Sequence, residues 1–532
     1  MNSTANTIWW LKKDFRLSDN PALAAALAGG QQVVPIFIIE PSAIDRKTAP
    51  ETSAFHLGAW IEAAKDLRKT LKANRGDLCI LHGEVVELFG ELKQRIDFDK
   101  VVSHEEVGNH RTFERDKAFA RWCKSHDVAW EEHRQTGIFR AFNDRDKRSG
   151  VWFNWMSEGP LPPPSESELK RIGVPQEAFE LQTDAARKLT LKSFGFEMSA
   201  SSRRLRQKVS ETAARETLQS FLYQRGIAYS GGISSPNSAF TAGSRLSVHL
   251  AWGTITGREV YAAATQRMEA LKNSDDPYAG QWRRSLSSFK ARLHWRDHFT
   301  QRLETEPTME FHPLNRAYDK LPTTRKNRKH LKAWTDGETG FPLVDACIRC
   351  AQTTGFLNFR MRSMITSVAC HALRLDWRDI NWPMAAWWAD YEPGIHLSQL
   401  QMQAGVVGIN TLRTYNPAKQ ITDHDPRAKF IKRWVPELKS FSADEIVGHQ
   451  DSPLIGYPAP IVDWKASTTA MRADYYALRR EPETKALAAA VMVKHGSRKR
   501  PSATRKRKTG KKKVTKKAAK KKTDDQLTLK FD

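Results

Sequence analysis

The sequence of 532 residues contains no run of about eighteen apolar residues, the length that a helix needs to cross a membrane. Residues 1–6 lack the basic and apolar segments of a secretory signal. Cysteine is scarce, with only Cys79, Cys123, Cys347, Cys350 and Cys370. So few cysteines in a chain of this length are typical of a reducing compartment and argue against a disulfide framework. The sequence therefore predicts a cytoplasmic protein that does not span a membrane.

A metal site is not expected either. Cys347 and Cys350 have the Cys-x-x-Cys spacing of many zinc ligands. The pair lies inside a helical pattern, however, and no cysteine follows Cys370 to complete a set of four. We interpret these cysteines as buried thiols.

Acidic residues are absent from residues 498–522, which contain fifteen Lys and Arg. Of the net charge of +25, this segment supplies +15 and the other residues +10. Because it has no apolar periodicity, it cannot bury enough surface to offset its chain entropy, and we expect residues 491–532 to form a disordered tail. The basic tail and the moderately basic remainder both indicate a polyanionic partner such as DNA.

Short β-rich runs alternate with helical patterns in the first 135 residues. The predicted strands are Ile8–Leu11, Val33–Ile39, Leu78–Leu81, Val101–His104 and Val128–Glu131, and the helices include Pro21–Leu27, Thr52–Asn74 and Asn109–His126. Such alternation is typical of right-handed βαβ units around a parallel sheet. We predict a Rossmann-like α/β domain over residues 1–135, although no Gly-x-Gly-x-x-Gly fingerprint follows any strand.

Strand patterns nearly disappear after residue 135. Residues 136–202 contain the proline-rich segment Gly159–Pro164, and we interpret them as a connector that runs over the surface. Helical periodicity dominates residues 203–490, with long amphipathic runs at Arg203–Arg225, Arg245–Ala270, Leu286–Leu303 and Pro342–Leu373. The predicted fold class is therefore α/β followed by an all-helical domain, with a connector between them and a disordered basic tail after them.

Three motifs, in this order along the two domains, carry a resemblance to a known family. They are Trp10–Leu23 (WLKKDFRLSDNPAL), Gly243–Ser247 (GSRLS) and Thr339–Asp345 (TGFPLVD). With these motifs the chain resembles the DNA photolyase/cryptochrome family over residues 7–480. The resemblance implies an α/β antenna domain, a helical domain that binds FAD, and light-driven chemistry on DNA.

The resemblance also assigns a loop to the diphosphate of the flavin. Its residues are Gly243, Ser244, Arg245, Leu246 and Ser247. A helix start there would offer N–H groups and the positive end of a dipole, although the same pattern alone is an ordinary helix cap. Tyr229 resembles the tyrosine that begins this site. Gly243 stands where the family often has threonine, which removes one hydroxyl contact.

A second group of residues would surround the flavin ring. By resemblance Arg362 and Asp390 form an ion pair beside the ring, with Glu392 near the ribityl chain and ring edge and Asn358 close by. A guanidinium there stabilises negative charge on reduced flavin, the state from which light drives electron donation. Elsewhere a lone arginine and a distant aspartate are surface charges of little energetic effect.

The segment His396–Met402 (HLSQLQM) departs from the family pattern, which is commonly Asn-Asn-Gly-Gly-Trp-Gln-Trp. His396 would therefore face flavin N5, and Leu400 replaces the tryptophan nearest the flavin in the electron-relay triad, whose middle member matches Trp377. Because an aliphatic side chain cannot relay an electron, photoreduction is slow or follows another route. The aromatic candidates, which can equally be packing residues, are Trp387, Trp388 and Tyr391. We assign catalytic roles to Trp377, Trp388 and His396.

The resemblance also assigns residues to the side of the pocket that would bind the damaged DNA, which we call the lesion side. The expected DNA contacts are Arg292, Trp295, Arg296 and Gln401, with Met402 lining the lesion pocket. Arg292 stands where many cyclobutane-dimer photolyases have a glutamate, and an arginine cannot accept a hydrogen bond. Photolyases for (6-4) photoproducts need histidines in the segment that matches Leu357–Arg362, which has none. His294, His298 and His371 are interpreted as core or surface residues.

Two further resemblances concern the ends of the chain. Glu105–Asn109 resembles the strand-end loop that contacts an antenna chromophore, and a folate, a deazaflavin or an empty site all remain open. Gln526–Phe531 (QLTLKF) resembles the Gln-x-x-Leu-x-Phe peptide that bacterial repair and replication proteins insert into the sliding clamp. The contacts to the clamp would come from Gln526, Leu529 and Phe531.

Together these features predict a photolyase that repairs cyclobutane pyrimidine dimers with FAD and blue or near-UV light, as a nucleoid-associated monomer. A cryptochrome-type photoreceptor that binds DNA is the alternative, favoured by Arg292, His396 and Leu400. The basic tail and the clamp-like peptide favour repair. A DNA-binding flavoprotein without photochemistry is a third interpretation, but it makes poor use of Arg362 and Asp390.

Overall fold

The structure, a computed structural model, describes residues 5–323 and 327–496. Its N-terminal part is built on a five-stranded sheet in the order β3-β2-β1-β4-β5, and every pair of neighbouring strands is parallel. The strands are β1 (Asn6–Leu11), β2 (Val33–Ile39), β3 (Cys79–His82), β4 (Phe98–His104) and β5 (Ala129–His133). All five predicted strands are present and the parallel α/β fold is confirmed.

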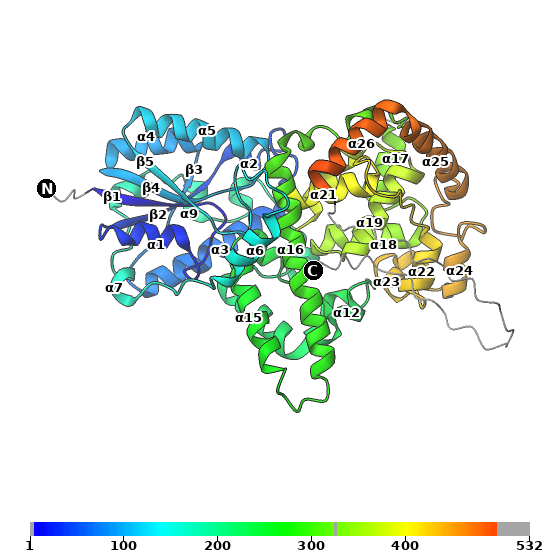
Figure 1. Ribbon diagram of the computed structural model, residues 1–532, viewed down its shortest axis with the longest axis horizontal. Coiled ribbons are helices and arrows are strands. Elements are labelled where there is room, and N and C mark those ends of the chain that lie inside the picture. The colour runs from blue at the N-terminus through cyan, green and yellow to red at the C-terminus, as the bar shows by residue number, and fades with distance from the viewer. Residues whose placement is uncertain (1–4, 324–326, 497–532) are drawn as a thin grey trace. The chain divides into compact units, whose positions relative to one another are not determined.

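Helices cover both faces of the sheet, as Figure 1 shows, because successive residues of a strand point to opposite sides. In β1, Trp9 packs in the same cluster as residues of α1 (Pro21–Ala28) and α3 (Ala54–Ala73). The next residue, Trp10, packs with residues of α4 (Val85–Arg95) and α5 (His110–Ser125). A short helix, α2 (Pro41–Ile44), follows β2. The carboxyl ends of the central strands therefore open at one edge, where a ligand can bind.

The connector is more ordered than the sequence predicted. It contains α6 (Arg148–Ser157), α7 (Glu166–Leu169), α8 (Gln176–Glu180), α9 (Asp184–Lys188) and α10 (Ala200–Leu205). Trp152 of α6 is fully buried, and its Nε1 donates to Asp297 at 2.8 Å. The expectation of a surface connector is therefore wrong for α6, which is anchored in the helical core by one large aromatic side chain.

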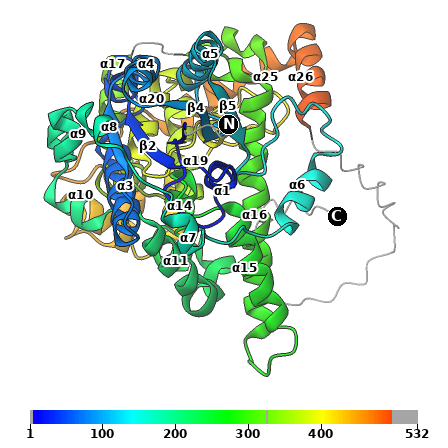
Figure 2. The same ribbon diagram turned by 90° about the vertical axis from the view of Figure 1, so that its left-hand side faces the viewer.

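The second part of the chain is helical, as predicted. Its α-helices are α11 (Glu211–Ser220), α12 (Tyr229–Gly232), α13 (Ala239–Ala242), α14 (Ser247–Ala251), α15 (Gly257–Ala270), α16 (Ala279–Thr305), α17 (Arg328–Asp336), α18 (Pro342–Thr354), α19 (Phe359–Ser367), α20 (Trp377–Trp387), α21 (Pro393–Ala404), α22 (Pro417–His424), α23 (Lys429–Trp434), α24 (Ala443–Gly448), α25 (Trp464–Arg480) and α26 (Pro482–His495). The longest of them, α16, lies beside α15 and α6 in Figure 2.

Some of the predicted long helices are interrupted at glycines. The run Arg245–Ala270 breaks between α14 and α15 at Gly253, whose φ is +67° and where a Cβ would lie 1.7 Å from the carbonyl oxygen of Lys13. The run Pro342–Leu373 breaks after α18 at Gly355, which has φ +70° and packs against Ala389. Both breaks bring the backbone of the helical domain close to other segments, so tertiary contact overrides helical periodicity there.

The motif Thr339–Asp345 holds the start of α18 together. The carboxylate of Asp345 accepts hydrogen bonds from Thr339 N (2.9 Å), Thr339 Oγ1 (2.6 Å), Gly340 N (3.1 Å) and the hydroxyl of Tyr457. Burial nevertheless raises the pKa of this carboxyl to about 6. The motif therefore stabilises the turn at which α18 begins.

The interpretation of the cysteines as buried thiols agrees with the structure. All five cysteines are free and buried. Residues 5–323 and 327–496 contain no group of His, Cys, Asp or Glu suited to a metal ion. Nor does this part of the chain have a helix that is both long enough and apolar enough to cross a membrane. The predicted disordered tail begins at residue 491, but α26 continues to His495, so that start is wrong. Residues 497–532, with the basic segment and the terminal peptide, lie outside the described residues.

Candidate functional site

The loop between α13 and α14 carries a half-buried cation. Arg245 has φ +60°, and its Cζ lies 3.7 Å from the ring centre of Phe356. Its Nη1 is buried and has no hydrogen-bond partner in the described chain. Burial lowers the pKa of the guanidinium to about 10. Since a buried charge is costly unless it is compensated, this loop is suited to an anionic group.

A second arginine, which the sequence analysis missed, fixes the backbone of the same loop. Arg225 donates to the carbonyl oxygen of Gly243 and, at 2.6 Å, to that of Ser244. It also donates to Thr217 O at 3.2 Å, which ties the loop to α11. Nothing in the sequence distinguishes Arg225 from other helical arginines, because its partners are backbone carbonyls. We infer that it positions the loop.

The helix after this loop is shorter than predicted. Ser247 is exposed at the start of α14, which has only five residues and no side-chain cap. Leu246 before it is fully buried, and its N–H donates to Ser244 Oγ at 3.4 Å. The expected helix-dipole contribution is therefore small, and Arg245 supplies the main positive charge of the loop.

Tyr229 and Arg292, assigned to the flavin and to the lesion, are neighbours. Tyr229 is buried at the start of α12 against Phe221 and Phe289, with ring centres 5.5 and 5.7 Å apart. Burial raises the pKa of Tyr229 to about 12, and Arg292 opposes this shift. Arg292 is exposed on α16. The two predicted sites therefore adjoin at this point.

Asn358 presents an unsatisfied acceptor. It precedes α19, and its Nδ2 donates to the carbonyl oxygens of Ile233 (3.0 Å) and Ser234 (2.9 Å). These bonds fix the amide, so that its Oδ1 is buried with no donor in the described residues. A buried acceptor of this kind indicates that a donor from a bound group belongs there.

The predicted ion pair between Arg362 and Asp390 is confirmed. Arg362 Nη2 lies 2.9 and 3.2 Å from the carboxylate oxygens of Asp390, and Nε donates to Leu357 O at 2.8 Å. The guanidinium stacks on Trp388, with Cζ 4.1 Å from the ring centre. The charges of this pair also influence the pKa of Arg245, which Asp390 raises and Arg362 lowers. The Arg362–Asp390 ion pair and the loop that carries Arg245 therefore lie near each other.

Glu392 and Arg296 form an ion pair. Arg296 Nη2 contacts the two carboxylate oxygens of Glu392 at 2.8 and 2.7 Å, and its Nη1 contacts Asp297 at 2.9 Å. Burial raises the pKa of Glu392, against the effect of Arg296. The guanidinium of Arg296 is thus occupied by two carboxylates, which leaves it little capacity to contact DNA as the sequence analysis expected.

His396 is neutral in this environment. Burial lowers its pKa to about 3. Its Nε2 lies 3.2 Å from the carbonyl oxygen and 2.9 Å from Oδ1 of Asn381, so the proton belongs on Nε2 and Nδ1 is an acceptor. The edge of the ring meets Tyr391, with ring centres 5.4 Å apart.

The expected DNA contact at Gln401 is wrong. Gln401 is fully buried, its Nε2 donates to Met309 O and His312 O, each at 2.8 Å, and its Oε1 accepts from Leu314 N at 2.9 Å. Its hydrogen-bonding capacity therefore holds the segment before α17. The neighbouring Met402 is half-buried.

The aromatic residues form a path that differs from the predicted triad. Trp388 meets Trp387 with ring centres 6.2 Å apart, and Trp387 meets Trp334 at 5.0 Å. Trp377 is buried beside the guanidinium of Arg378 at 4.8 Å. Leu400 is buried in the same core. Trp388 thus connects the Arg362 ion pair to a row of tryptophans.

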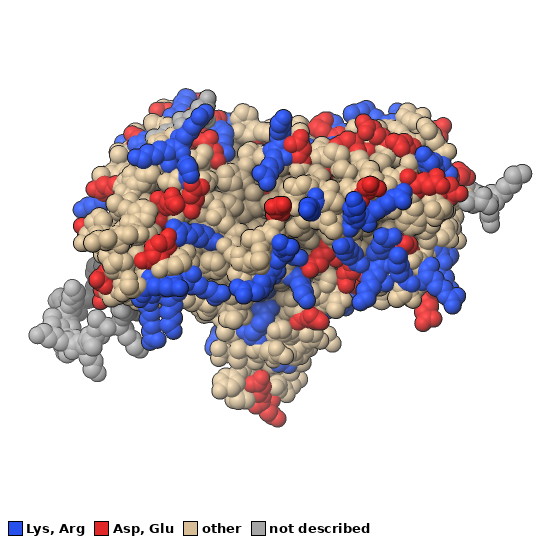
Figure 3. All heavy atoms as spheres, turned by 180° about the vertical axis from the view of Figure 1, so that it is seen from behind, with Lys and Arg blue, Asp and Glu red and all other residues tan. Residues whose placement is uncertain are grey.

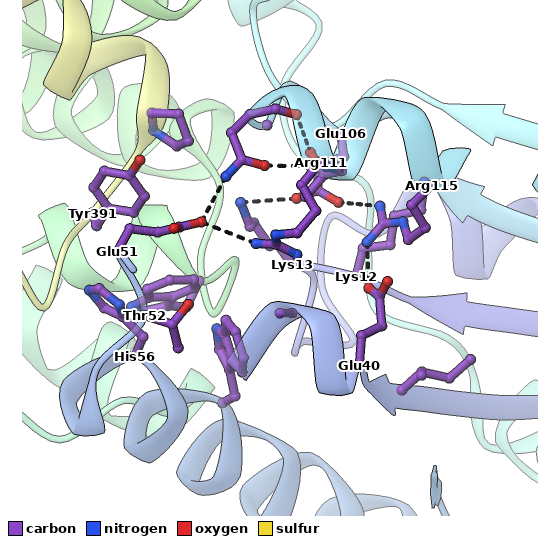
Figure 4. A pocket seen from close by; sticks show the side chains of 18 of the residues that line it. Lys12, Lys13, Glu40, Glu51, Thr52, His56, Glu106, Arg111, Arg115 and Tyr391 are labelled. Atoms are coloured by element: carbon purple, nitrogen blue, oxygen red, sulfur yellow. Dashed lines mark hydrogen bonds and ion pairs between the residues drawn. The ribbon is translucent and has the colours of Figure 1, made fainter. Parts of the chain in front are cut away.

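A cavity of about 90 Å³ lies at the edge of the parallel sheet (Figure 4). One wall is aromatic, with His56, Trp252 and Tyr391. Burial lowers the pKa of His56 to about 4, so this histidine is neutral. Tyr391 precedes Glu392, so the cavity adjoins the segment whose residues the sequence predicts to bind the flavin.

The opposite wall of this cavity is a network of paired charges. Arg115 contacts Glu40 (2.8 Å) and Glu106 (2.7 Å), and Lys13 contacts Glu106 at 3.0 Å. Asn109 donates to Glu51 at 2.7 Å. Of the predicted antenna loop, Glu106 and Asn109 line this cavity, whereas Glu105 lines an adjoining one. A ligand here would meet compensated charges and aromatic faces.

Comparison with known proteins decides the family. Residues 7–149 match the family model described as DNA photolyase, and residues 289–477 match the model described as the FAD binding domain of DNA photolyase. The chain belongs to the DNA photolyase/cryptochrome family. Asn358, Arg362, Asp390 and Glu392 lie within the second match, whereas the Arg245 loop lies between the two matches.

Three relatives illustrate the range of this photolyase/cryptochrome family. The deoxyribodipyrimidine photo-lyase of Synechococcus sp. is 27% identical, over 90% of this chain and 99% of that protein. Cryptochrome DASH of Natronomonas pharaonis is 26% identical, over 85% and 97%. The crystal structure of an archaeal photolyase from Sulfolobus tokodaii with two FAD molecules superposes with a TM-score of 0.71 at 25% identity, over 89% and 100%.

Proposed function

We propose that this chain is a light-driven DNA lyase that repairs cyclobutane pyrimidine dimers with reduced FAD. The observation that carries the proposal is the Arg362–Asp390 ion pair stacked on Trp388, inside the segment that matches the FAD binding domain of DNA photolyase. When bound and excited by blue or near-UV light, reduced FAD supplies an electron that splits the dimer, after which the electron returns.

The residues present fit this cofactor. The Arg245 loop and Asn358 each offer a buried polar atom without a partner in the described chain, Nη1 of Arg245 and Oδ1 of Asn358. Arg245 would hold the diphosphate, with the Gly243–Ser247 backbone and Tyr229 beside it. Asn358, Arg362 and Asp390 would hold the flavin ring. An N–H group of the ring would donate to Oδ1 of Asn358, which has no other donor in the described chain. Glu392, paired with Arg296, would lie farther along the cofactor.

The side chains of this site act by electrostatics and exclusion of water. Arg362 provides positive charge where the reduced cofactor is negative, and Asp390 and Trp388 keep the guanidinium in one orientation. His396, neutral and protonated on Nε2, presents Nδ1 as an acceptor and adds no second cation. The site thus favours the anionic reduced state through one fixed charge.

On the lesion side we retain Arg292, Trp295 and Met402 as substrate contacts. Arg292 is exposed and is a pure donor, so it can bind a carbonyl oxygen of the dimer or a phosphate. Trp295 is half-buried against Phe299, with ring centres 5.4 Å apart, and offers an aromatic surface. A dimer reaches such a pocket by leaving the base stack, which costs least in single-stranded DNA.

A cryptochrome-type photoreceptor is the second candidate. The specific observation in its favour is that Leu400 is buried where the family has a redox-active tryptophan, next to a neutral His396. In a receptor, a change of flavin charge would alter the surroundings of His396, and a partner would detect the change. The exposed Arg292 in place of a glutamate favours the same candidate.

The cavity at the sheet edge is proposed as an antenna site. Its aromatic wall of Trp252 and Tyr391 suits a planar chromophore, and its compensated charges suit one of low net charge. The archaeal photolyase with two FAD molecules shows that a relative can hold a second flavin. A folate, a deazaflavin and a flavin are therefore all candidates for this cavity.

We propose that DNA binds both to a basic band on the surface of the protein and to the basic tail. Figure 3 shows one face on which Lys and Arg side chains form a band along its lower part. The tail adds the fifteen cations of residues 498–522, which would bind phosphates without sequence preference. We also propose that Gln526, Leu529 and Phe531 bind the sliding clamp, which would bring the enzyme to replicating DNA in the nucleoid.

Repair and signalling are separated by one experiment. Reduced protein is illuminated with single-stranded and double-stranded DNA that contains cyclobutane dimers, and thymine absorbance is followed against a dark control. The lyase proposal expects light-dependent recovery, faster on single strands. Absence of recovery on both substrates, with flavin bound, would exclude the lyase and leave the photoreceptor.

A further inference from the structure

Two buried arginines face the two nitrogens of a single histidine between α6 and α16. Nη1 of Arg148 lies 3.3 Å from Nδ1 of His298, and Nη2 of Arg302 lies 3.4 Å from its Nε2. A neutral imidazole has one acceptor nitrogen and one N–H. His298 can therefore accept a hydrogen bond from only one of the two guanidinium groups, and its own N–H must face the other.

The histidine does not add a charge. Burial and the neighbouring Arg302, Arg148 and Arg145 all hold the pKa of His298 well below its ordinary value. Burial and its two arginine neighbours also lower the pKa of Arg302, to about 10. The cluster is thus a group of cations around a neutral ring.

Among residues 5–323 and 327–496, no carboxylate forms an ion pair with Arg148 or Arg302, and only the more distant charge of Asp297 acts favourably on Arg148. Arg148 is 5% exposed and Arg302 7%, and Nε and Nη2 of Arg148 and Nε of Arg302 are buried without a hydrogen-bond partner.

Two acids on the same helix or beside its end, Asp297 and Glu306, already have partners. Asp297 accepts from Trp152 Nε1 (2.8 Å) and Gly137 N (3.1 Å) and pairs with Arg296. Glu306 pairs with Lys494 (2.5 Å) and His495 (3.0 Å). Neither acid is therefore available to the two buried arginines.

Buried cations without a counter-charge are strongly unfavourable unless an anion joins them. Guanidinium groups bind tetrahedral oxyanions through several parallel N–H donors. We propose that Arg148 and Arg302, held on either side of the neutral His298, form a binding site for a phosphate group. Arg145 stands at its rim, where its Nε donates to Gly496 O at 2.8 Å.

The position of the site links it to DNA. His298 lies one turn from Trp295 on α16, with ring centres 6.0 Å apart, and Trp295 is a proposed lesion contact. Gly496, held by Arg145, is the last described residue before the basic tail. A backbone phosphate in this site would lie near the lesion side, and this assignment rests on the proposed function. Free phosphate has the same chemistry and needs no DNA.

Thermal unfolding with inorganic phosphate tests the site directly. At constant ionic strength, replacing chloride by phosphate should raise the Tm of the full-length protein until the site is saturated. Arg148→Gln and Arg302→Gln should each abolish this dependence on phosphate, and Arg302→Lys should retain part of it. Arg283→Gln, on an exposed position of the same helix, is the matched control and should behave as the wild type.

Salt-dependent binding of undamaged single-stranded DNA identifies the source of the phosphate. If a backbone phosphate occupies the site, Arg302→Gln lowers the slope of log K against log salt concentration by about one, and Arg283→Gln serves as the control. If Arg302→Gln loses the phosphate effect on Tm but keeps the wild-type slope for DNA binding, the site binds free phosphate and not the DNA backbone. A wild-type Tm that does not respond to phosphate, together with an unchanged slope, overturns the proposal.

The phosphate site can be tested even if the arginine variants do not fold or the protein does not repair dimers. If the arginine variants do not fold, hydrogen exchange of residues 144–150 and 296–303 in the wild type should slow on addition of phosphate, and unchanged exchange contradicts the site. Neither measurement needs light, flavin reduction or a lesion. Failure of dimer repair would therefore leave the phosphate site standing, and the reverse also holds.

Discussion

The guanidinium carbon of Arg362 lies 4.1 Å from the ring centre of Trp388, and the same guanidinium donates to Asp390 at 2.9 Å. A cation that is stacked on one face and paired at its edge is held in a single orientation. Trp388 also meets Trp387, which meets Trp334. The residues that would stabilise reduced flavin are thus in contact with a row of aromatic rings.

This row predicts the route of photoreduction. Trp387→Phe should slow light-driven reduction of bound FAD by about tenfold or more, equivalent to a barrier higher by about 1.4 kcal/mol. Trp377→Phe, which changes a tryptophan stacked with Arg378, is the matched control and should have a smaller effect. Flavin absorbance under continuous illumination measures both rates. A larger effect of Trp377→Phe would show that the electron takes the path of the family triad.

Arg225 should act on the cofactor through the loop that it holds. Arg225→Ala removes the donors to Gly243 O and Ser244 O, and we expect FAD affinity to fall about tenfold, or about 1.4 kcal/mol. Hydrogen exchange of residues 241–247 should accelerate in the variant. Arg284→Ala, at an exposed position of α16, provides a control that should alter neither property. Weaker binding with unchanged exchange of the loop would contradict a positioning role.

Asp345 predicts a pH dependence of stability. Its pKa is about 6 in the folded protein against an ordinary 3.8, so between these values the folded state binds more protons than the unfolded state. The free energy of unfolding should therefore fall as pH rises from 4 to 6, by about 3 kcal/mol in total from this group. Chemical denaturation of the wild type and of Asp345→Asn measures the effect. A difference between the two proteins that does not change with pH would show that the carboxyl titrates normally.

The tail should contribute affinity for DNA without specificity. Removal of residues 497–532 should weaken binding of single-stranded DNA at low salt by tenfold or more, because each neutralised phosphate contributes a slope of about 0.7 in log K against log salt. Removal of residues 526–532 alone should leave this binding unchanged and abolish capture by the sliding clamp. If the full chain and the protein without residues 497–532 bind DNA with equal affinity, the tail does not contribute to DNA binding.

The fold could be predicted because its signals are local. The five strands follow from short β-rich runs between helices, and Asn109 and His126 at the ends of a predicted helix are the residues that flank α5. The helix breaks at Gly253 and Gly355 could not be predicted, because they depend on contacts with Lys13 and Ala389, far away in the sequence.

The site was predictable only in part. The Arg362–Asp390 pair follows from the family motifs, since the two residues are 28 positions apart and no local pattern joins them. Gln401 was misassigned because its partners, Met309 O and His312 O, are backbone atoms from another segment. Arg225 was missed for the same reason, since it binds carbonyl groups that any sequence would offer.

The flavin content of the purified protein tests the central claim most directly. The wild type should be yellow and hold one FAD per chain after reconstitution. Arg362→Ala should bind FAD about 10- to 100-fold more weakly, because it removes the charge beside the ring and leaves Asp390 unpaired. Arg349→Ala, which breaks an ion pair with Glu437, is the control and should retain the flavin. A colourless wild type that takes up no FAD would contradict the account.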